Sequence, residues 1–164
     1  PQIFGDSSAY ADVYSISPKE VAFYIQDKME FDDMVINVGL RYDQFDPESV
    51  YPSDRRNPAN QLILPDSMMS LYREAPVISQ ISPRVGFAYQ LGGQAVLHFS
   101  YGHFFQMPPM YAMYENNSFL VDPNNFVTRM GNTLLEPEKT ITYEIGLWQE
   151  LNQVMALDLS LIHI

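Results

Sequence analysis

Three histidines and a scatter of carboxylates are the side chains of this sequence best suited to chemistry. His98 and His103 are five residues apart, so on a strand they face opposite sides and cannot share a metal ion. The acidic residues lack the regular spacing of a calcium loop, and carboxylates far apart in sequence do not indicate a glycosidase. The sequence contains no nucleophile elbow, phosphate loop or helical zinc motif. We therefore predict no enzyme activity, no metal site and no cofactor.

A second group of polar side chains lies on the polar side of segments that have a two-residue hydrophobic period. The candidates are Asn37, Arg41, Asp43, Arg84, His98 and Glu144. If these segments close into a barrel, the group lines its lumen, where it can contact a ligand or a protein segment inside the barrel. The alternative is a ladder of cross-strand charges that only solvates the lumen. The sequence leaves both possibilities open.

A third group lies in the stretch 106–139, which is rich in aromatic, Met and Asn residues. The candidates are Tyr111, Tyr114, Asn116, Asn117 and Phe126. Flat apolar rings beside hydrogen-bonding amides suit an oligosaccharide, a peptide or a chelate as ligand. The alternative is a loop that packs over its own apolar residues, because long loops also need internal packing.

Strands are the elements that must position these side chains. In residues 20–31 the odd positions carry apolar side chains such as Val21, Phe23 and Ile25, whereas the even positions are mostly polar. A helix would mix the two sets, because its period is near 3.6 residues. The two-residue period marks the segments 20–31, 34–45, 81–91, 95–105, 140–151 and 154–161. Their lengths are close to the roughly 9–11 residues with which a tilted strand crosses a bilayer.

The connections between these segments alternate between short and long. Residues 32–33, 92–94 and 152–153 form tight turns, whereas 46–80 and 106–139 form long loops. Short turns at one end and long loops at the other are typical of outer-membrane barrels, and such long loops are uncommon in compact soluble domains. We predict that the odd positions of the first, third, fourth and fifth strands face lipid, as do the even positions of the second. The opposite positions then face the lumen.

The composition excludes several classes of function. With 9 basic and 20 acidic residues, the net charge of −11 argues against binding nucleic acid or anionic lipid headgroups through a basic surface. Cysteine is absent, so there is neither a disulfide framework nor a thiolate metal site. The 11 Tyr and 10 Phe residues favour strands and membrane interfaces. The chain begins at Pro1 without a signal peptide, and we expect it to be a fragment.

Four strings in order resemble the barrel strands of TonB-dependent receptors. They are NVGLRYDQFDP (37–47), ISPRVGFAYQL (81–91), LHFSYGHFFQMP (97–108) and LEPEKTITYEIGLWQEL (135–151). The likeness is greatest to the Oar-like group, which carries a carboxypeptidase-regulatory-like domain before its plug. The resemblance implies an all-β, antiparallel transmembrane β-barrel of about 22 strands with a plugged lumen, of which this chain supplies about six meandering strands.

The resemblance also implies a function and a set of partners. The whole receptor would lie in the bacterial outer membrane, contact its lipid, and import a scarce ligand with energy delivered by TonB through the plug domain. The ligand is an unknown small molecule: a siderophore, cobalamin, a glycan or a peptide. This chain shows no plug, no TonB box and no C-terminal aromatic signature.

The last residues, LSLIHI, break the alternation that precedes them. This hexapeptide is also the translation of CTG TCT CTT ATA CAC ATC, a transposase end used as a sequencing adapter. We therefore predict that residues 1–159 form a partial receptor barrel and that 160–164 are a non-native tail. A continuous genomic reading frame through these codons would contradict this prediction.

Two other functions fit the same patterns. A passive porin or structural outer-membrane barrel shares every feature above, and an upstream plug and TonB box would distinguish the receptor from it. A soluble β-sandwich binding module would instead fold without detergent as a monomer, whereas a barrel fragment exposes apolar faces and unpaired edges.

Overall fold

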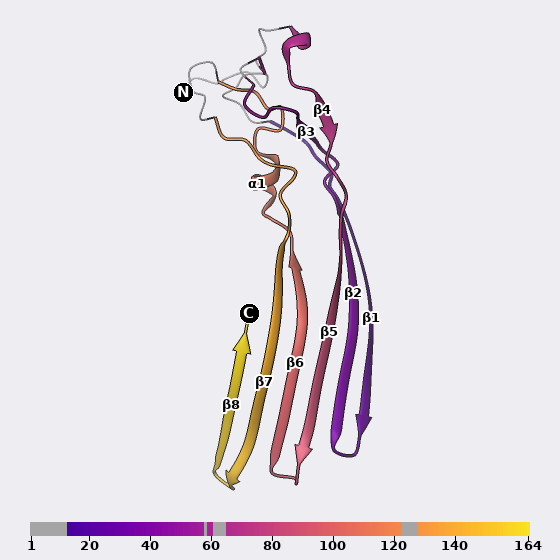
Figure 1. Ribbon diagram of the computed structural model, residues 1–164, viewed down its shortest axis with the longest axis vertical. Helices are drawn as coiled ribbons and strands as arrows, with labels where there is room; N and C mark the ends of the chain where they lie inside the picture. The colour runs from indigo at the N-terminus through magenta and orange to yellow at the C-terminus, as the bar shows by residue number, and fades with distance from the viewer. Residues whose placement is uncertain (1–12, 58, 61–64, 123–127) are drawn as a thin grey trace. The chain divides into compact units, whose positions relative to one another are not determined.

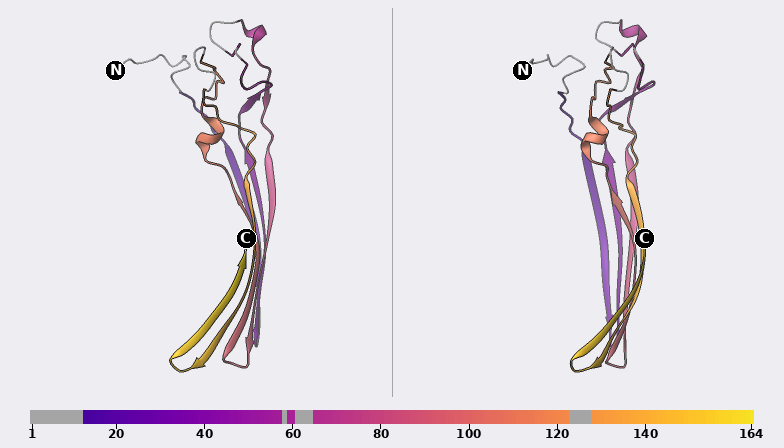
Figure 2. Two further views of the ribbon diagram at one scale, coloured as in Figure 1. Left: turned by 60° about the vertical axis from the view of Figure 1, so that its left-hand side comes forward. Right: turned by 90° about the vertical axis from the view of Figure 1, so that its left-hand side faces the viewer.

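The computed structural model describes residues 13–57, 59–60, 65–122 and 128–164, and its main element is a six-stranded antiparallel sheet. The strands are β1 (Lys19–Phe31), β2 (Met34–Asp46), β5 (Ile78–Leu91), β6 (Ala95–Gln106), β7 (Glu138–Asn152) and β8 (Met155–His163). They lie side by side in chain order, β1-β2-β5-β6-β7-β8, so the sheet is a meander (Figure 1). The sheet is open, with β1 and β8 at its edges, and twists along its length (Figure 2). The all-β, antiparallel prediction of six strands is confirmed.

Tight turns join the strands at one end of this sheet, the lower end in Figure 1. Gly92 and Gly93, between β5 and β6, have φ angles of 60° and 79°, a left-handed backbone that glycine adopts without a steric penalty. The predicted turns at 32–33 and 92–94 are confirmed. The last turn is shifted by one residue, because β7 continues to Asn152, which pairs with Met155 across a register irregularity.

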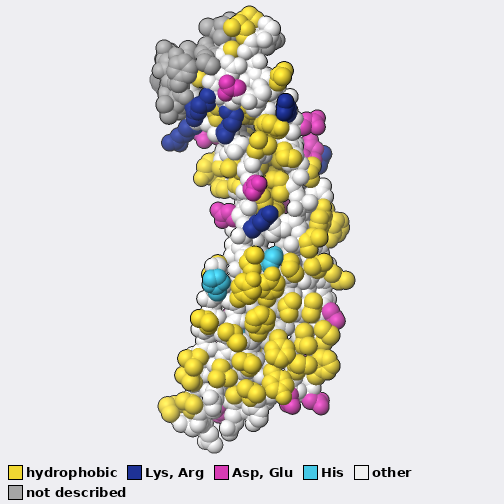
Figure 3. All heavy atoms as spheres, in the orientation of Figure 1, with side chains coloured by type: hydrophobic (Ala, Val, Ile, Leu, Met, Phe, Trp, Pro, Cys, Tyr) yellow, Lys and Arg dark blue, Asp and Glu magenta, His cyan; other side chains and the backbone are white. Residues whose placement is uncertain are grey.

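The register of the sheet separates the side chains into two faces. Phe87 pairs with Phe99, and Phe99 pairs with Ile145, so a row of apolar side chains runs across three strands. The neighbouring pairs, Gly86 with Ser100 and Ser100 with Glu144, place small and polar groups on the other face. On the apolar face, Ile25 remains 73% exposed and Ile145 48% exposed. Figure 3 shows hydrophobic side chains spread over the viewed face of the strands.

The C-terminal residues take part in the pairing of β8 with β7. Leu161 pairs with Ile145 on the apolar face, and Ser160 pairs with Gly146 on the polar face. The alternation therefore persists through Leu161 and breaks at Ile162, which pairs with Glu144. The origin of residues 160–164 stays a prediction that the source DNA tests.

The described residues within 1–20, 45–78 and 107–136 form a second compact unit, which we call the loop unit. The strand unit comprises 21–44, 79–106 and 137–164. The loop unit contains the antiparallel pair β3 (Val50–Pro52) and β4 (Tyr72–Glu74), the 3-10 turn η1 (Asp66–Met68) and the short helix α1 (Met110–Tyr114). The sequence predicts only loops here, because elements of three to five residues are too short to show a period.

A small core holds the loop unit together. Phe45, Met113 and Tyr114 are each at most 2% exposed and pack with the partly buried Ile16, Met107 and Leu135. No helix in the described parts of the chain is long and apolar enough to cross a membrane.

Candidate functional site

The polar face of the sheet contains a groove of about 450 Å³. It crosses five strands, and glycines stand where the sheet would otherwise project side chains into it: Gly39 on β2, Gly86 on β5 and Gly102 on β6. The polar side chains along the groove are Gln26, Asn37, Arg84, Ser100, Thr142 and Glu144. The groove is therefore a hollow lined by hydrogen-bonding groups, on the face opposite the apolar rows.

The predicted residues Asn37, Arg84 and Glu144 line this groove together. The carboxylate of Glu144 accepts a hydrogen bond from Ser100 Oγ at 3.3 Å and lies 3.8 Å from Nε2 of His98. The imidazole of His98 lies directly over Gly146, since a Cβ at that glycine would clash with the ring. His103 pairs with Ile141 on the apolar face, which confirms that the two histidines face opposite sides.

Arg41 and Asp43 lie two residues apart on β2 and form an ion pair. Nε of Arg41 donates to Oδ1 and Oδ2 of Asp43 at 2.9 and 3.0 Å, and Nη2 lies 2.8 Å from Oδ1. The Asp43 side chain is buried, whereas that of Arg41 is partly exposed. Such a two-point contact fixes the guanidinium in one orientation.

Arg84 lies beside this pair but has a different partner. Its guanidinium carbon lies 4.9 Å from the ring centroid of Phe104, a cation–π geometry. The ring of Phe104 itself lies over Gly102, where a Cβ would approach it to 3.1 Å. Phe104 is not among the candidates that the sequence offers, although its even position on the strand 95–105 places it on the polar face.

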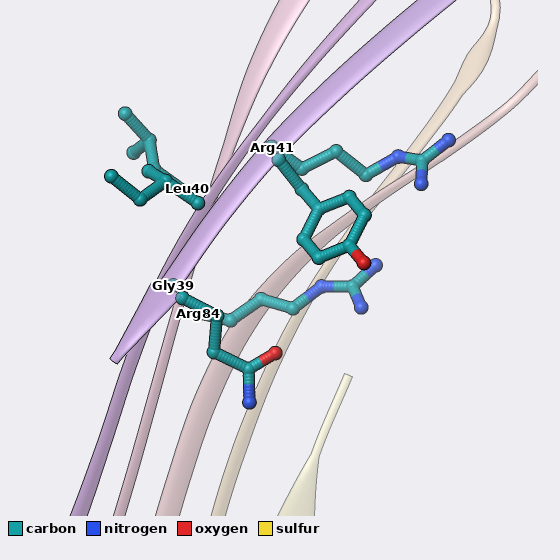
Figure 4. Close-up of a pocket in the computed structure, with 7 residues that line it drawn as sticks. Gly39, Leu40, Arg41 and Arg84 are labelled. Carbon is teal, nitrogen blue, oxygen red and sulfur yellow. The ribbon is translucent and has the colours of Figure 1, made fainter. Parts of the chain in front are cut away.

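A smaller hollow of about 240 Å³ lies over Gly39. Its polar lining is Tyr24, Gln26, Arg41 and Arg84. Figure 4 shows the side chains of Arg41 and Arg84 extending side by side in the same direction, whereas Leu40 points to the other side of the strand. Two guanidinium groups therefore flank one space.

The loop candidates are mostly engaged within the loop unit. The hydroxyl of Tyr114, on α1, donates to the carbonyl oxygen of Pro47 at 3.0 Å. Asn116 has a left-handed backbone with φ of 50°, and its amide bonds the backbone of Leu120 in both directions. Asn117 accepts a hydrogen bond from Ser49 Oγ at 3.0 Å. These three side chains thus stabilise the loop in this conformation.

Tyr111 is the loop candidate that remains open to solvent, with 66% of its surface exposed. Phe126 lies outside the described residues. Burial, with a smaller contribution from the charge of Asp46, raises the pKa of the Tyr114 hydroxyl. That phenol therefore stays a neutral hydrogen-bond donor across the physiological range.

Within the described ranges, no three His, Asp or Glu side chains converge as a metal site requires. The polar face offers hydrogen bonds, ion pairs and a cation–π contact.

The sequence matches a family model described as TonB dependent receptor-like, beta-barrel, over residues 2–161. The match spans nearly the whole chain and includes both units. No curated protein matches the sequence.

Proposed function

Since this chain belongs to the family of TonB-dependent receptor β-barrels, we propose that it forms part of an outer-membrane receptor that imports a scarce ligand, and that its polar sheet face lines the barrel interior. Members of this family are outer-membrane receptors and transporters rather than enzymes. The match confirms the resemblance of the four strings at the level of the family. The likeness to the Oar-like group stays a prediction.

The separation of the two faces is the observation that carries the proposal. Apolar side chains such as Ile25 and Ile145 are exposed on one face, which is unfavourable in water and favourable in lipid. A soluble sandwich would bury such a row against a second layer. The other face carries the groove with its charged and amide side chains, as a wet lumen requires.

The partners follow from this assignment. The apolar face would contact outer-membrane lipid, and the groove would face the space through which a small ligand passes. Energy from TonB would reach the barrel through a plug domain. A passive porin shares the two faces but not the energy requirement. Uptake by the intact receptor that stops when TonB is removed supports the receptor, and uptake that continues supports the porin.

Two neighbouring residues of β5 test the orientation of the sheet. Phe87 lies on the apolar face, where it pairs with Phe99, and Ala88 lies on the polar face, where it pairs with His98. In the full receptor, Phe87→Lys should cost about 2–4 kcal/mol if the site is near the bilayer midplane. Ala88→Lys should cost much less, because its charge stays in a wet lumen. Folding titrations in lipid measure both, and equal penalties would reject the orientation.

A further inference from the structure

We propose that the hollow over Gly39 is an anion-binding site in which Arg84 takes the carboxylate group of a small solute. The proposal rests on the proposed function, because a solute reaches this face only if the face lines the barrel interior.

Among the described residues, the ion pairs of the polar face leave one cation without a carboxylate partner. Arg41 is neutralised by Asp43 through contacts of 2.8 to 3.0 Å. The carboxylate of Glu144 already accepts from Ser100 and lies beside His98. Among the residues that the structure describes, Arg84 has no carboxylate within ion-pair distance, and its charge meets only the face of Phe104. One positive charge on this face is thus left for a partner from outside.

The ring of Phe104 holds the guanidinium of Arg84 in place. Arg84 and Gly102 are paired in the register, and the Phe104 ring occupies the space that Gly102 leaves open. The ring holds the guanidinium at 4.9 Å from its centroid, on one side only. Arginine recognises carboxylates through two parallel N–H groups in a plane, so a guanidinium held in place loses less conformational freedom on binding.

The space over Gly39 is open to a bound group. A Cβ on Gly39 would lie 3.6 Å from the carbonyl oxygen of Ile25 and 3.9 Å from Gln26, which are ordinary contacts. Packing within the chain therefore does not exclude a side chain there, and the space of about 240 Å³ is open to a bound group. Tyr24 and Gln26 line it with a hydroxyl and an amide that make no hydrogen bond to other described residues.

The chemistry of the lining favours a carboxylate over a phosphate. The Arg41–Asp43 pair is neutral as a unit, so Arg84 supplies one net positive charge, which a monoanionic carboxylate balances. A phosphate dianion would need a second free cation. The tyrosine hydroxyl and glutamine amide can donate to the carboxylate oxygen that the guanidinium does not bind.

Residue-resolved labelling of the full receptor tests the site. p-Hydroxyphenylglyoxal modifies exposed guanidinium groups, and peptide mass spectrometry reads each arginine separately. Arg84 should be labelled in detergent-solubilised receptor without added solute. Propionate, a monoanion, at about ten times its Kd should slow this labelling about tenfold, following the fraction of sites left free. Propionamide, which is neutral, should not slow it. Arg73, an exposed residue of the loop unit, is the internal control in the same digest, and its labelling should not respond to propionate.

Variants at Gly39 test the space itself. Gly39→Leu should fill the hollow, so that Arg84 is still labelled but propionate no longer protects it. Gly39→Ala is the milder variant and should weaken protection while the receptor folds normally. Protection that survives in Gly39→Leu would overturn the assignment of the hollow.

Other outcomes overturn the proposal in distinct ways. Equal protection by propionate and phosphate would show an unselective cationic surface. Arg84 that cannot be labelled without solute would show that the receptor's own chain covers it. If propionate does not slow the labelling of Arg84, while Phe87→Lys costs more folding free energy than Ala88→Lys, the site is rejected and the proposed function stands. If the two lysine variants cost the same folding free energy, the proposed function itself is rejected.

Discussion

The loop unit and the strand unit bury their apolar side chains in opposite ways. Prolines aside, the buried apolar side chains of the described chain all belong to the loop unit: Phe45, Ala59, Met113, Tyr114, Phe119, Leu120 and Val121. The strand unit instead exposes its large apolar residues, among them Phe23, Ile25 and Ile145. The loop unit thus buries apolar side chains in its own interior, whereas the strand unit presents them outward, as a lipid-facing surface does.

The two units also satisfy their polar groups differently. In the sheet, the backbone groups pair through regular ladders between neighbouring strands. In the loop unit, side chains bond isolated backbone groups: Tyr114 donates to Pro47, Thr133 Oγ1 donates to Val50, and Arg55 donates to Met130 and Gly131. Irregular backbone that is partly buried depends on such bonds, because no ladder supplies them.

Removing a core side chain from the loop unit should have the largest effect. Phe45→Ala should destabilise this unit by about 3–5 kcal/mol, because it leaves a cavity beside Met113 and Tyr114. Hydrogen exchange of the amides in 113–121, measured in the full receptor, should speed up accordingly. Phe45→Leu is the control and should cost less than about 1.5 kcal/mol. If both variants exchange at the wild-type rate, the loop unit has no core of its own.

A comparison of two glycines should show the next largest effect. A Cβ at Gly131 would lie 2.5 Å from the backbone carbonyl of Met113, so Gly131→Ala forces the backbone to move. The cost should be about 1–3 kcal/mol, read as faster proteolysis of the loop unit. At Gly86, in the sheet, a Cβ would meet only the side chain of Asn37 at 3.7 Å. Gly86→Ala should therefore change the stability little, and a large loss there would show that the groove is packed rather than open.

The hydroxyl of Tyr114 should have a smaller effect. Tyr114→Phe leaves the carbonyl of Pro47 without this donor and should cost the loop unit about 1–2 kcal/mol. Tyr111→Phe is the matched control, because this exposed tyrosine should contribute nothing measurable. Hydrogen exchange rates of the loop unit in the full receptor distinguish the two variants. Identical rates in both would show that the hydrogen bond from Tyr114 to Pro47 does not stabilise the loop unit.

Alkaline pH should produce the smallest effect. The raised pKa of Tyr114 means that the folded state holds the phenol proton more tightly than the unfolded state does. Stability from this group is complete below the ordinary tyrosine pKa of 10.0 and is lost as the pH rises above it. Exchange of the loop unit should accelerate above that pH in the wild type and less in Tyr114→Phe. An equal acceleration in both would assign the effect to other groups.

The strands could be predicted from the sequence because a two-residue period over a dozen residues is hard to produce otherwise. The faces follow from the same period, which places Asn37, Arg84 and Glu144 on one side of the sheet, and all three line the groove. The loop unit could not be predicted, since its core joins Phe45 to Met113 across more than sixty positions of irregular chain. Sequence spacing carries no signal for such contacts.

The candidate site was predicted only in part. The charged residues of the groove were identified, but the cation–π contact of Arg84 with Phe104 depends on the register between β5 and β6. For Tyr114 and Asn116, the residue types fit either ligand contacts or a loop that packs on itself. The structure has both side chains in internal hydrogen bonds. Residue type alone does not separate a binding loop from a self-supporting one.

The tight turns have a consequence for how the length of this chain can vary. Because paired residues share a face, adding one residue beside Gly92 and Gly93 would shift β6 by one position and turn Phe99 inward and His98 outward. Residues added between β2 and β5 or between β6 and β7 carry no such penalty, since long connections absorb them before the next strand begins. Insertions and deletions among relatives should therefore gather at one rim of the barrel, and the opposite rim should keep a fixed number of residues.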